Sequence, residues 1–316
     1  MNPAGGGARV LAGVDIGTLT CRLLIAKATA GGGLAKLHAE RRILRLGEGV
    51  DHHRLLQPAA MKRVIETLHE WRQTIERYHV DRRIAVATSA VRDAINRDAF
   101  LAMVKQETGF EVEVISGEEE ARRTLLGIRA GLSPGTGDIV GLDIGGGSTE
   151  FIIDRRGRPP AVRSIELGVV RLTERLFKHD PPMPEELEAA WRLILDLMQP
   201  VKLELGDLAG LTFVGTAGTV TTLAAMAQRL PRYEAARVHQ YGLSLQTIRE
   251  LEQTVVSRSN VQRRELPGLE AGREEVVVAG TLILRTVMEC LGFQDCVVSE
   301  MGLREGVLID LAQRIA

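Results

Sequence analysis

Short apolar runs alternate with longer amphipathic stretches along the whole chain. Strands are expected for the apolar runs at 10–15, 22–28, 34–45, 84–88, 111–115, 149–154, 162–167, 211–214 and 296–299. Helices are expected for the stretches with helical spacing at 58–78, 96–107, 116–129, 169–177, 185–205, 273–291 and 302–315. Because strands and helices are mixed in both halves, the pattern predicts an α/β fold with mixed sheets.

One stretch of this pattern occurs twice. Residues 11–17 (LAGVDIG) and 139–145 (IVGLDIG) both form an apolar run that ends in Asp-x-Gly, and a small polar residue and a second apolar run follow in both places. The repeat predicts a duplicated domain, and a glycine-rich, loop-like stretch lies between the copies. We therefore expect a first domain at 1–128, a second at 129–300, and a last helix at 301–316 that packs back on the first domain.

Charge and composition narrow the class of protein. The 316 residues include 40 Lys+Arg and 41 Asp+Glu, so the net charge is only −1. Such a chain has no overall field that attracts nucleic acid or an anionic membrane, and we expect neither as a partner. The apolar runs are shorter than the roughly 18 residues of a membrane span. The start has no signal-peptide core, and the three cysteines have no disulfide or metal spacing, so we expect a cytoplasmic protein.

The motif at 143–150, Asp-Ile-Gly-Gly-Gly-Ser-Thr-Glu, is the strongest chemical signal in the chain. Its glycines, Gly145–Gly147, allow backbone N–H groups to surround an anion, and Ser148 adds a hydroxyl donor. Asp143 and Glu150 flank the loop with carboxylates that suit a hard cation. A glycine-rich hairpin turn is the alternative, but a plain turn needs fewer glycines and no flanking acids.

Two further motifs predict contacts with phosphate. The first copy of the repeat continues as Gly17-Thr18-Leu-Thr-Cys-Arg22, which alone is most often a tight turn and becomes a second phosphate clamp when paired with the first motif. The stretch 215–219, Gly-Thr-Ala-Gly-Thr, lies between an expected strand and a helix that ends near residue 229. A helix N-terminus favours an anion there, although a close-packed strand–helix turn explains the same residues almost equally well.

One acid and one arginine are candidates on weaker grounds. Ser116 and Glu119 form the spacing of a capping box, so the first acids of this helix are explained by helix chemistry. Glu120 is expected to face the cleft, where a carboxylate is able to take a proton from an attacking water. Arg92 follows the end of an apolar strand, 87–91, and strand ends in open α/β sheets point into ligand crevices. A surface ion pair is the alternative for Arg92.

Taken together, these residues resemble a known family. Blocks similar to the exopolyphosphatase / guanosine pentaphosphate phosphohydrolase (Ppx/GppA) family occur, in the family's order, at 15–22, 87–92, 115–121, 143–150 and 215–219, and 299–306 looks like its closing block. The resemblance implies two actin-like domains with the site in the cleft between them. It implies Glu120 as the catalytic glutamate, Asp143 and Glu150 as ligands of Mg²⁺ (or Mn²⁺), and Arg22, Arg92 and Arg273 as phosphate-contacting arginines.

The resemblance therefore predicts an exopolyphosphatase of the short two-domain form, which releases terminal phosphate from polyphosphate or guanosine pentaphosphate. The predicted phosphate-binding residues are Gly17, Thr18, Arg22, Arg92, Gly145, Gly146, Gly147, Ser148, Gly215, Thr216, Gly218, Thr219 and Arg273. Two alternatives stay open, a non-enzymatic regulator that binds guanosine tetra- or pentaphosphate and a small-molecule kinase of the same fold. A homodimer also stays open. One departure from the family is Leu19, which stands where members usually carry a polar residue and cannot hydrogen-bond a phosphate.

Overall fold

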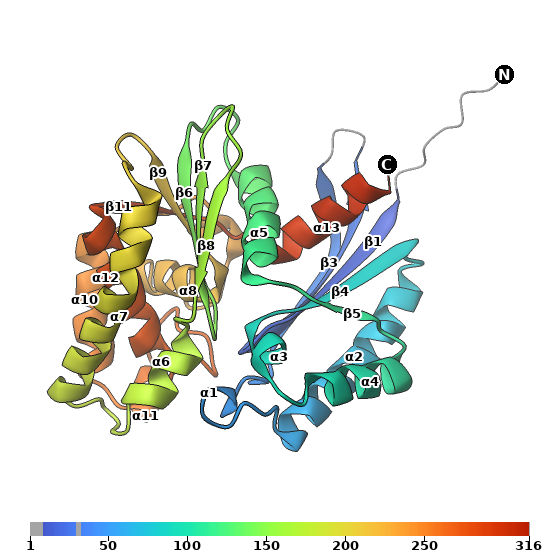
Figure 1. Ribbon diagram of the computed structural model, residues 1–316, viewed down its shortest axis with the longest axis horizontal. Coiled ribbons are helices and arrows are strands. Elements are labelled where there is room, and N and C mark those ends of the chain that lie inside the picture. Colours follow the sequence, from blue (N-terminus) through green and yellow to red (C-terminus); the bar gives the residue numbers. More distant parts are fainter. Residues whose placement is uncertain (1–8, 30–32, 316) are drawn as a thin grey trace.

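Two mixed β-sheets, each covered by helices, form the two halves of the molecule, and two further helices lie between the sheets (Figure 1). The structure, a computed structural model, describes residues 9–29 and 33–315. No helix in these two stretches is long and apolar enough to cross a bilayer.

The first domain is built on a five-stranded sheet with the order β3-β2-β1-β4-β5. Its strands are β1 (Val10–Ile16), β2 (Thr20–Ala28), β3 (Leu34–Ile43), β4 (Arg82–Ala87) and β5 (Val112–Val114). Its helices are α1 (Val50–His53), α2 (Pro58–Arg77), α3 (Ser89–Asp93) and α4 (Arg97–Thr108). Strands β1 to β3 form an antiparallel meander, whereas β4 and β5 run parallel to β1.

The second domain is built on a six-stranded sheet with the order β10-β11-β9-β6-β7-β8. Its strands are β6 (Ile139–Ile144), β7 (Thr149–Asp154), β8 (Ala161–Ile165), β9 (Thr212–Thr216), β10 (Gly242–Ser244) and β11 (Asp295–Val298). Its helices are α6 (Val169–Leu176), α7 (Pro184–Leu205), α8 (Ala217–Ala227), α9 (Ala235–Val238), α10 (Leu245–Val256), α11 (Asn260–Arg263) and α12 (Val277–Leu291).

The two sheets share one topology. From β8, the second sheet reads β8-β7-β6-β9-β11, which repeats β3-β2-β1-β4-β5 with the same parallel and antiparallel pairings. The α/β fold with mixed sheets is therefore confirmed, and each copy of the Asp-x-Gly motif occupies the same place, at the end of β1 and of β6. Asp15 pairs across the sheet with Arg22, and Asp143 pairs with Glu150.

Helices α5 (Gly117–Gly131) and α13 (Leu303–Arg314) fill the space between the sheets (Figure 1). Helix α5 packs on the second sheet, where Ile128 joins a cluster with Ile139 and Ile152. Helix α13 packs on the first sheet, where Leu308 contacts a cluster that includes Leu11. The last helix of the chain, α13, therefore packs against β1, the first strand of the chain. Helix α5 carries Glu120 into the space between the domains.

Some expected boundaries differ from the structure. The strand expected to continue to residue 91 ends at Ala87, and Ser89–Asp93 forms the short helix α3, so Arg92 lies on a helix. The long helix expected from Arg273 begins at Val277. Val276 is the N-cap, and the carbonyl of Arg273 accepts both its amide and that of Val277, which makes the first i→i−4 bond. The Arg273 side chain lies ahead of the helix and pairs with Glu270 at 2.7 Å.

Helices α5 and α13 approach each other at two glycines. A Cβ on Gly306 would overlap the carbonyl of Arg123, and a Cβ on Gly127 would overlap the carbonyl of Gly302. Both neighbours are backbone atoms, which cannot rotate away. The two helices can therefore approach this closely only because Gly127 and Gly306 have no side chain.

We predict that Gly306→Ala lowers the free energy of unfolding by about 1–3 kcal/mol, since overpacking outweighs the gain of about 1 kcal/mol in helix propensity. Gly137→Ala is the matched control, because a Cβ there meets no atom within 4 Å. Urea unfolding of both variants measures the difference. A Gly306→Ala protein as stable as the control would show that the helices can move apart without loss.

Candidate active site

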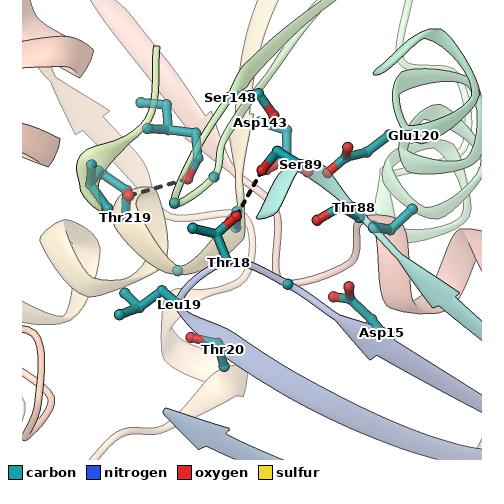
Figure 2. Close-up of a pocket in the computed structure, with 18 of the residues that line it drawn as sticks. Asp15, Thr18, Leu19, Thr20, Thr88, Ser89, Glu120, Asp143, Ser148 and Thr219 are labelled. Atoms are coloured by element: carbon teal, nitrogen blue, oxygen red, sulfur yellow. Dashed lines mark hydrogen bonds between the residues drawn. The ribbon is translucent and has the colours of Figure 1, made fainter. Parts of the chain in front are cut away.

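A cavity of about 60 Å³ lies between the domains, where the two Asp-x-Gly loops meet (Figure 2). Both domains contribute to its wall. The predicted site residues that line it are Gly17, Thr18, Arg22, Glu120, Asp143, Gly145, Gly146, Ser148, Gly218, Thr219 and Arg273. The fold thus brings together residues that are far apart in the sequence.

The two loops are built alike. The amide of Gly17 donates to the carbonyl of Thr20 at 3.1 Å, and the amide of Gly145 donates to the carbonyl of Ser148 at 2.9 Å. Between these closures, the amides of Thr18 and Gly146 have no hydrogen-bond acceptor within residues 9–29 and 33–315. Unpaired N–H groups in a tight loop are suited to bind an anion.

Hydroxyl groups tie the loops to neighbouring elements. Thr18 Oγ1 lies 2.7 Å from Ser89 Oγ at the start of α3, and Thr219 Oγ1 of α8 donates to the carbonyl of Ile144 at 3.2 Å (Figure 2). These bonds fix the helix that follows β4 and the helix that follows β9 against the loops. Two helices therefore begin at the cavity, one from each domain.

Four acidic side chains, Asp15, Glu120, Asp143 and Glu150, are buried at this point, each no more than 7% exposed. Burial raises the pKa of Asp15 to about 6, although Arg22 opposes the shift. Burial and the nearby Asp143 raise the pKa of Glu150 to about 8. Burial, with Glu150 and Asp143, also raises the pKa of Glu120 well above its ordinary value. Without a cation these raised pKa values favour protonated carboxyl groups, because the buried charges are not solvated by water.

The oxygen atoms of these acids are incompletely satisfied. Asp15 Oδ1 and Glu150 Oε2 are buried and have no hydrogen-bond partner in the described part of the chain. Glu150 Oε1 accepts from Ser164 at 2.8 Å, and Asp143 Oδ2 accepts from Thr124 at 3.3 Å. Free carboxylate oxygens of this kind fit a small hard cation such as Mg²⁺ or Mn²⁺.

The acids do not close around a single point. Within residues 9–29 and 33–315, no three His, Cys, Asp or Glu side chains are grouped closely enough to enclose a metal ion. Mg²⁺ is commonly bound by one or two carboxylates, with water and substrate phosphates as the other ligands. The donor set is of this type, with Asp143 and Glu150 as candidate protein ligands.

Two arginines approach the acids, and a third lies on the cavity wall. Arg92 Nη1 lies 3.4 Å from Glu120 Oε2 and also donates to the carbonyl of Ile115. Arg22 Nη1 lies 3.9 Å from Asp15 Oδ2. Arg273 reaches the cavity beside Gly218, where a Cβ would overlap its guanidinium group. Arg22 and Arg92 partly balance the buried acids, whereas Arg273 pairs with Glu270 at 2.7 Å.

Five predicted residues do not line this cavity. Gly147 and Arg92 line separate cavities next to it, and Thr216 lines a larger cavity on the other side of Asp143. Glu150 is fully buried behind the loop. Gly215 is packed against Cys296 and Val220, so its lack of a side chain serves the fit of β9 against its neighbours.

The sequence analysis missed several residues of the wall. Asp15 has a signal in the sequence, because it stands in the first Asp-x-Gly copy at the place of Asp143. Thr88 and Ser89 follow β4 as Ala217 and Gly218 follow β9, so the repeated topology also points to them. Leu19 lines the cavity but packs its side chain into the core of the second domain.

Comparison with known proteins agrees with this architecture. The model of the Ppx/GppA phosphatase family matches residues 24–315. The chain belongs to this family. An exopolyphosphatase 2 from Mycobacterium tuberculosis (strain ATCC 25618 / H37Rv) is 36% identical over 318 residues, with 96% of this chain and 98% of the relative covered. As a Ppx/GppA member, the protein is a hydrolase of phosphoanhydride bonds.

Solved structures of the Ppx/GppA family have the same fold. The crystal structure of the Aquifex aeolicus family member matches with a TM-score of 0.82 and 34% identity, over 97% of this chain and 98% of the other. An exopolyphosphatase from Cytophaga hutchinsonii matches with a TM-score of 0.89 and 27% identity, over 97% and 98%. The predicted fold of two actin-like domains is therefore confirmed.

We predict that the metal-free protein loses thermal stability as the pH rises from about 5 to about 8. Between the ordinary pKa of Glu150, 4.5, and its raised pKa of about 8, the folded state holds a proton that the unfolded state has lost. The contribution of Glu150 to the stability of the folded state is complete below the ordinary pKa and is lost as the pH rises through the raised pKa. Asp15, with its pKa raised from 3.8 to about 6, acts in the same direction.

Calorimetric melting temperatures in chelator across this pH range measure the effect. Glu150→Gln, which removes the titration, should flatten the fall, whereas Glu118→Gln on the exposed side of the same region should not. Added Mg²⁺ should stabilise the wild type most at the alkaline end, where the acids are ionised. An equal slope for the wild type and Glu150→Gln would exclude Glu150 as its source.

Proposed function

We propose that the protein removes the terminal phosphate from inorganic polyphosphate or guanosine pentaphosphate, with Glu120 as the general base and Mg²⁺ or Mn²⁺ as cofactor. The observation that carries the proposal is the place of Glu120. Its carboxyl group faces the cavity from α5, opposite the two phosphate-type loops (Figure 2). A water between this carboxylate and an anion held by the loops has a base on one side and an electrophile on the other.

The surroundings of Glu120 suit proton abstraction. Burial and two neighbouring acids raise its pKa, so that the group is a stronger base than a solvated glutamate. Arg92, at 3.4 Å, opposes the shift and favours the ionised form that a base requires. The capping bond from the amide of Glu119 to Ser116 Oγ holds the first turn of the helix that carries Glu120.

The loops and acids divide the remaining tasks. The free amides of the loops at Thr18 and Gly146 bind the phosphate that is transferred. Asp143 and Glu150 are the residues that would hold the divalent cation, which supplies charge neutralisation on the phosphate oxygens when bound. Arg22 stabilises the leaving part of the substrate, because it lines both this cavity and a second one, and Arg273 adds a cation to the wall of the first.

A second cavity of about 190 Å³ adjoins the first and shares Arg22, Asp143 and Ala217 with it. Lys36, Arg41 and Arg304 add further cations to its wall. This cavity is the place for the part of a polyanionic substrate that lies beyond the bond to be cleaved.

Closely spaced arginines characterise this side of the site, where Arg41 and Arg273 share the partner Glu270 and Arg304 pairs with Glu305. Burial lowers the pKa of Arg41, and its neighbours Arg22 and Arg304 add to the effect. Burial likewise lowers the pKa of Arg273, with Arg41 and Arg22 contributing. Cations close enough to destabilise one another are stabilised by a bound polyanion.

The named relatives support this substrate class. The Mycobacterium tuberculosis protein is an exopolyphosphatase, and a protein from Photobacterium profundum is a guanosine-5'-triphosphate,3'-diphosphate pyrophosphatase. That second relative is 29% identical, with 96% of this chain but 59% of its own length covered. Both names describe hydrolysis of a phosphate chain, which the two adjoining cavities accommodate.

We predict that Glu120→Gln lowers kcat on tripolyphosphate by roughly 10²–10⁴-fold with little change in substrate binding, because the amide cannot accept the proton. Glu118→Gln, an exposed neighbour in the same turn, should remain near wild type. Phosphate release and equilibrium binding are measured on both variants. Turnover by Glu120→Gln within a factor of about three would mean that another group is the base. Binding of guanosine pentaphosphate without turnover by the wild type would favour a regulator.

We predict that the double variant Lys36→Ala, Arg41→Ala raises KM for guanosine pentaphosphate and long polyphosphate more than for tripolyphosphate. Only the larger substrates extend into the second cavity, and the difference should shrink at high salt. Arg163→Ala is the matched control, since Arg163 lines a cavity on the other side of the cleft. Equal KM changes for short and long substrates would place the substrate chain elsewhere.

A further inference from the structure

Both phosphate-type loops are held from behind through their carbonyl groups. In the second domain, the first amides of α6 donate to the loop, Val169 to the carbonyl of Gly145 at 3.0 Å and Val170 to that of Gly146 at 2.8 Å. A Cβ on Gly168 would overlap Gly146, so the approach is close. Helix α6 therefore sets which way the peptide groups of this loop face.

The first domain has an equivalent support. The segment after β3 donates its amides to the other loop, Leu44 and Arg45 to the carbonyl of Leu19 at 2.9 Å and Gly47 to the carbonyl of Thr18 at 2.8 Å. This segment leads directly into α1, which carries Asp51. Each loop thus has its own support, and the two supports belong to different domains.

Arg171 joins the two supports. Its side chain is 8% exposed, and its three nitrogen atoms bind in three directions. Nε donates to the carbonyl of Gly147 at 2.9 Å, Nη1 to Asp51 Oδ1 at 2.5 Å, and Nη2 to Asp93 Oδ2 at 2.7 Å. One guanidinium group therefore touches the loop of the second domain and two elements of the first, α1 and α3.

The partners of Arg171 lead to the chemistry. Asp93 ends the short helix that begins with Ser89, the partner of Thr18, and follows Arg92, which contacts Glu120. Arg175 also binds Asp51 but makes no bond to the loop or to Asp93. Arg171 thus connects the Gly147 loop of the second domain with helices α1 and α3 of the first domain.

We propose that Arg171 is a positioning residue that couples closure of the cleft to the geometry of both phosphate loops. When the domains separate, Asp51 and Asp93 move away from the guanidinium group. The guanidinium is then no longer held in one orientation, and its hydrogen bond to the Gly147 carbonyl no longer fixes the loop. A planar fork makes three bonds at once, which a lysine ammonium on a flexible stem does not reproduce. The step that depends on this alignment is phosphate transfer, for which a displacement of about 1 Å far from the chemistry can cost about 10²-fold in rate.

The first arm of the test measures domain closure without any activity. Spin labels on Lys62→Cys of α2 and Lys202→Cys of α7, in a Cys290→Ser background, report the distance between the outer helices of the two domains. We expect Arg171→Lys and Arg171→Met to broaden this distance distribution toward longer values, and Arg175→Gln, which removes only a contact with Asp51, to broaden it less. A wild-type distribution in both Arg171 variants would overturn the proposal. Because Arg171→Lys keeps the charge, it remains testable if Arg171→Met does not fold.

The second arm separates positioning from simple binding. This arm rests on the proposed hydrolase activity, whereas the distance measurement does not. Failure of the proposed activity can therefore be distinguished from failure of the proposal for Arg171. On tripolyphosphate we expect Arg171→Lys to lower kcat by about 10–100-fold with KM changed by less than about threefold, and Arg175→Gln to stay near wild type. Opening of the cleft with kcat unchanged would show that Arg171 only holds the domains together, and would also overturn the proposal.

Discussion

The burial of four acidic residues around the cleft between the domains is the constraint on which the rest of the site depends. Asp15, Glu120, Asp143 and Glu150 are all removed from water, and charges in such surroundings are strongly unfavourable unless they are paired. The arginines that approach, Arg22 and Arg92, stand at 3.9 and 3.4 Å, so the pairing is loose. Perturbed buried acids of this kind cluster at functional sites, and this cluster is the reason for which a divalent cation is proposed here.

The duplicated fold explains how the acids come to face one another. Each domain ends its first strand in Asp-x-Gly, so the two aspartates meet across the cleft at equivalent positions. The cross-strand partners differ, because Asp15 faces Arg22 whereas Asp143 faces Glu150. One copy thus adds a cation beside its aspartate and the other a second acid. This difference at one cross-strand position is the reason for which the divalent cation is proposed to bind to the second domain.

Much of this could be predicted from the sequence, since the Asp-x-Gly copies, the glycines at 145–147 and the alternation of strands and helices all reside in short stretches. The early end of β4 at Ala87 could not, because residues 88–91 are apolar or small and fit a strand as well as the short helix that they form. Contacts between distant segments were also beyond sequence reasoning. Nothing in the neighbours of Arg171 along the chain shows that it meets Asp51, 120 residues earlier. Such roles follow from the packing of the two domains, which a linear pattern does not encode residue by residue.

Leu19 shows why the closed cleft and the phosphate loops form one unit. Its apolar side chain is unsuited to phosphate, yet it stands in the first loop, where its carbonyl accepts two amides and its side chain enters the core of the opposite domain. Apolar packing thus anchors the first loop to the second domain, while Arg171 anchors the second loop to the first domain. The anchoring is reciprocal, so each loop has one contact that exists only while the domains are closed. The geometry that a phosphate meets is therefore a property of the closed molecule and not of either loop alone.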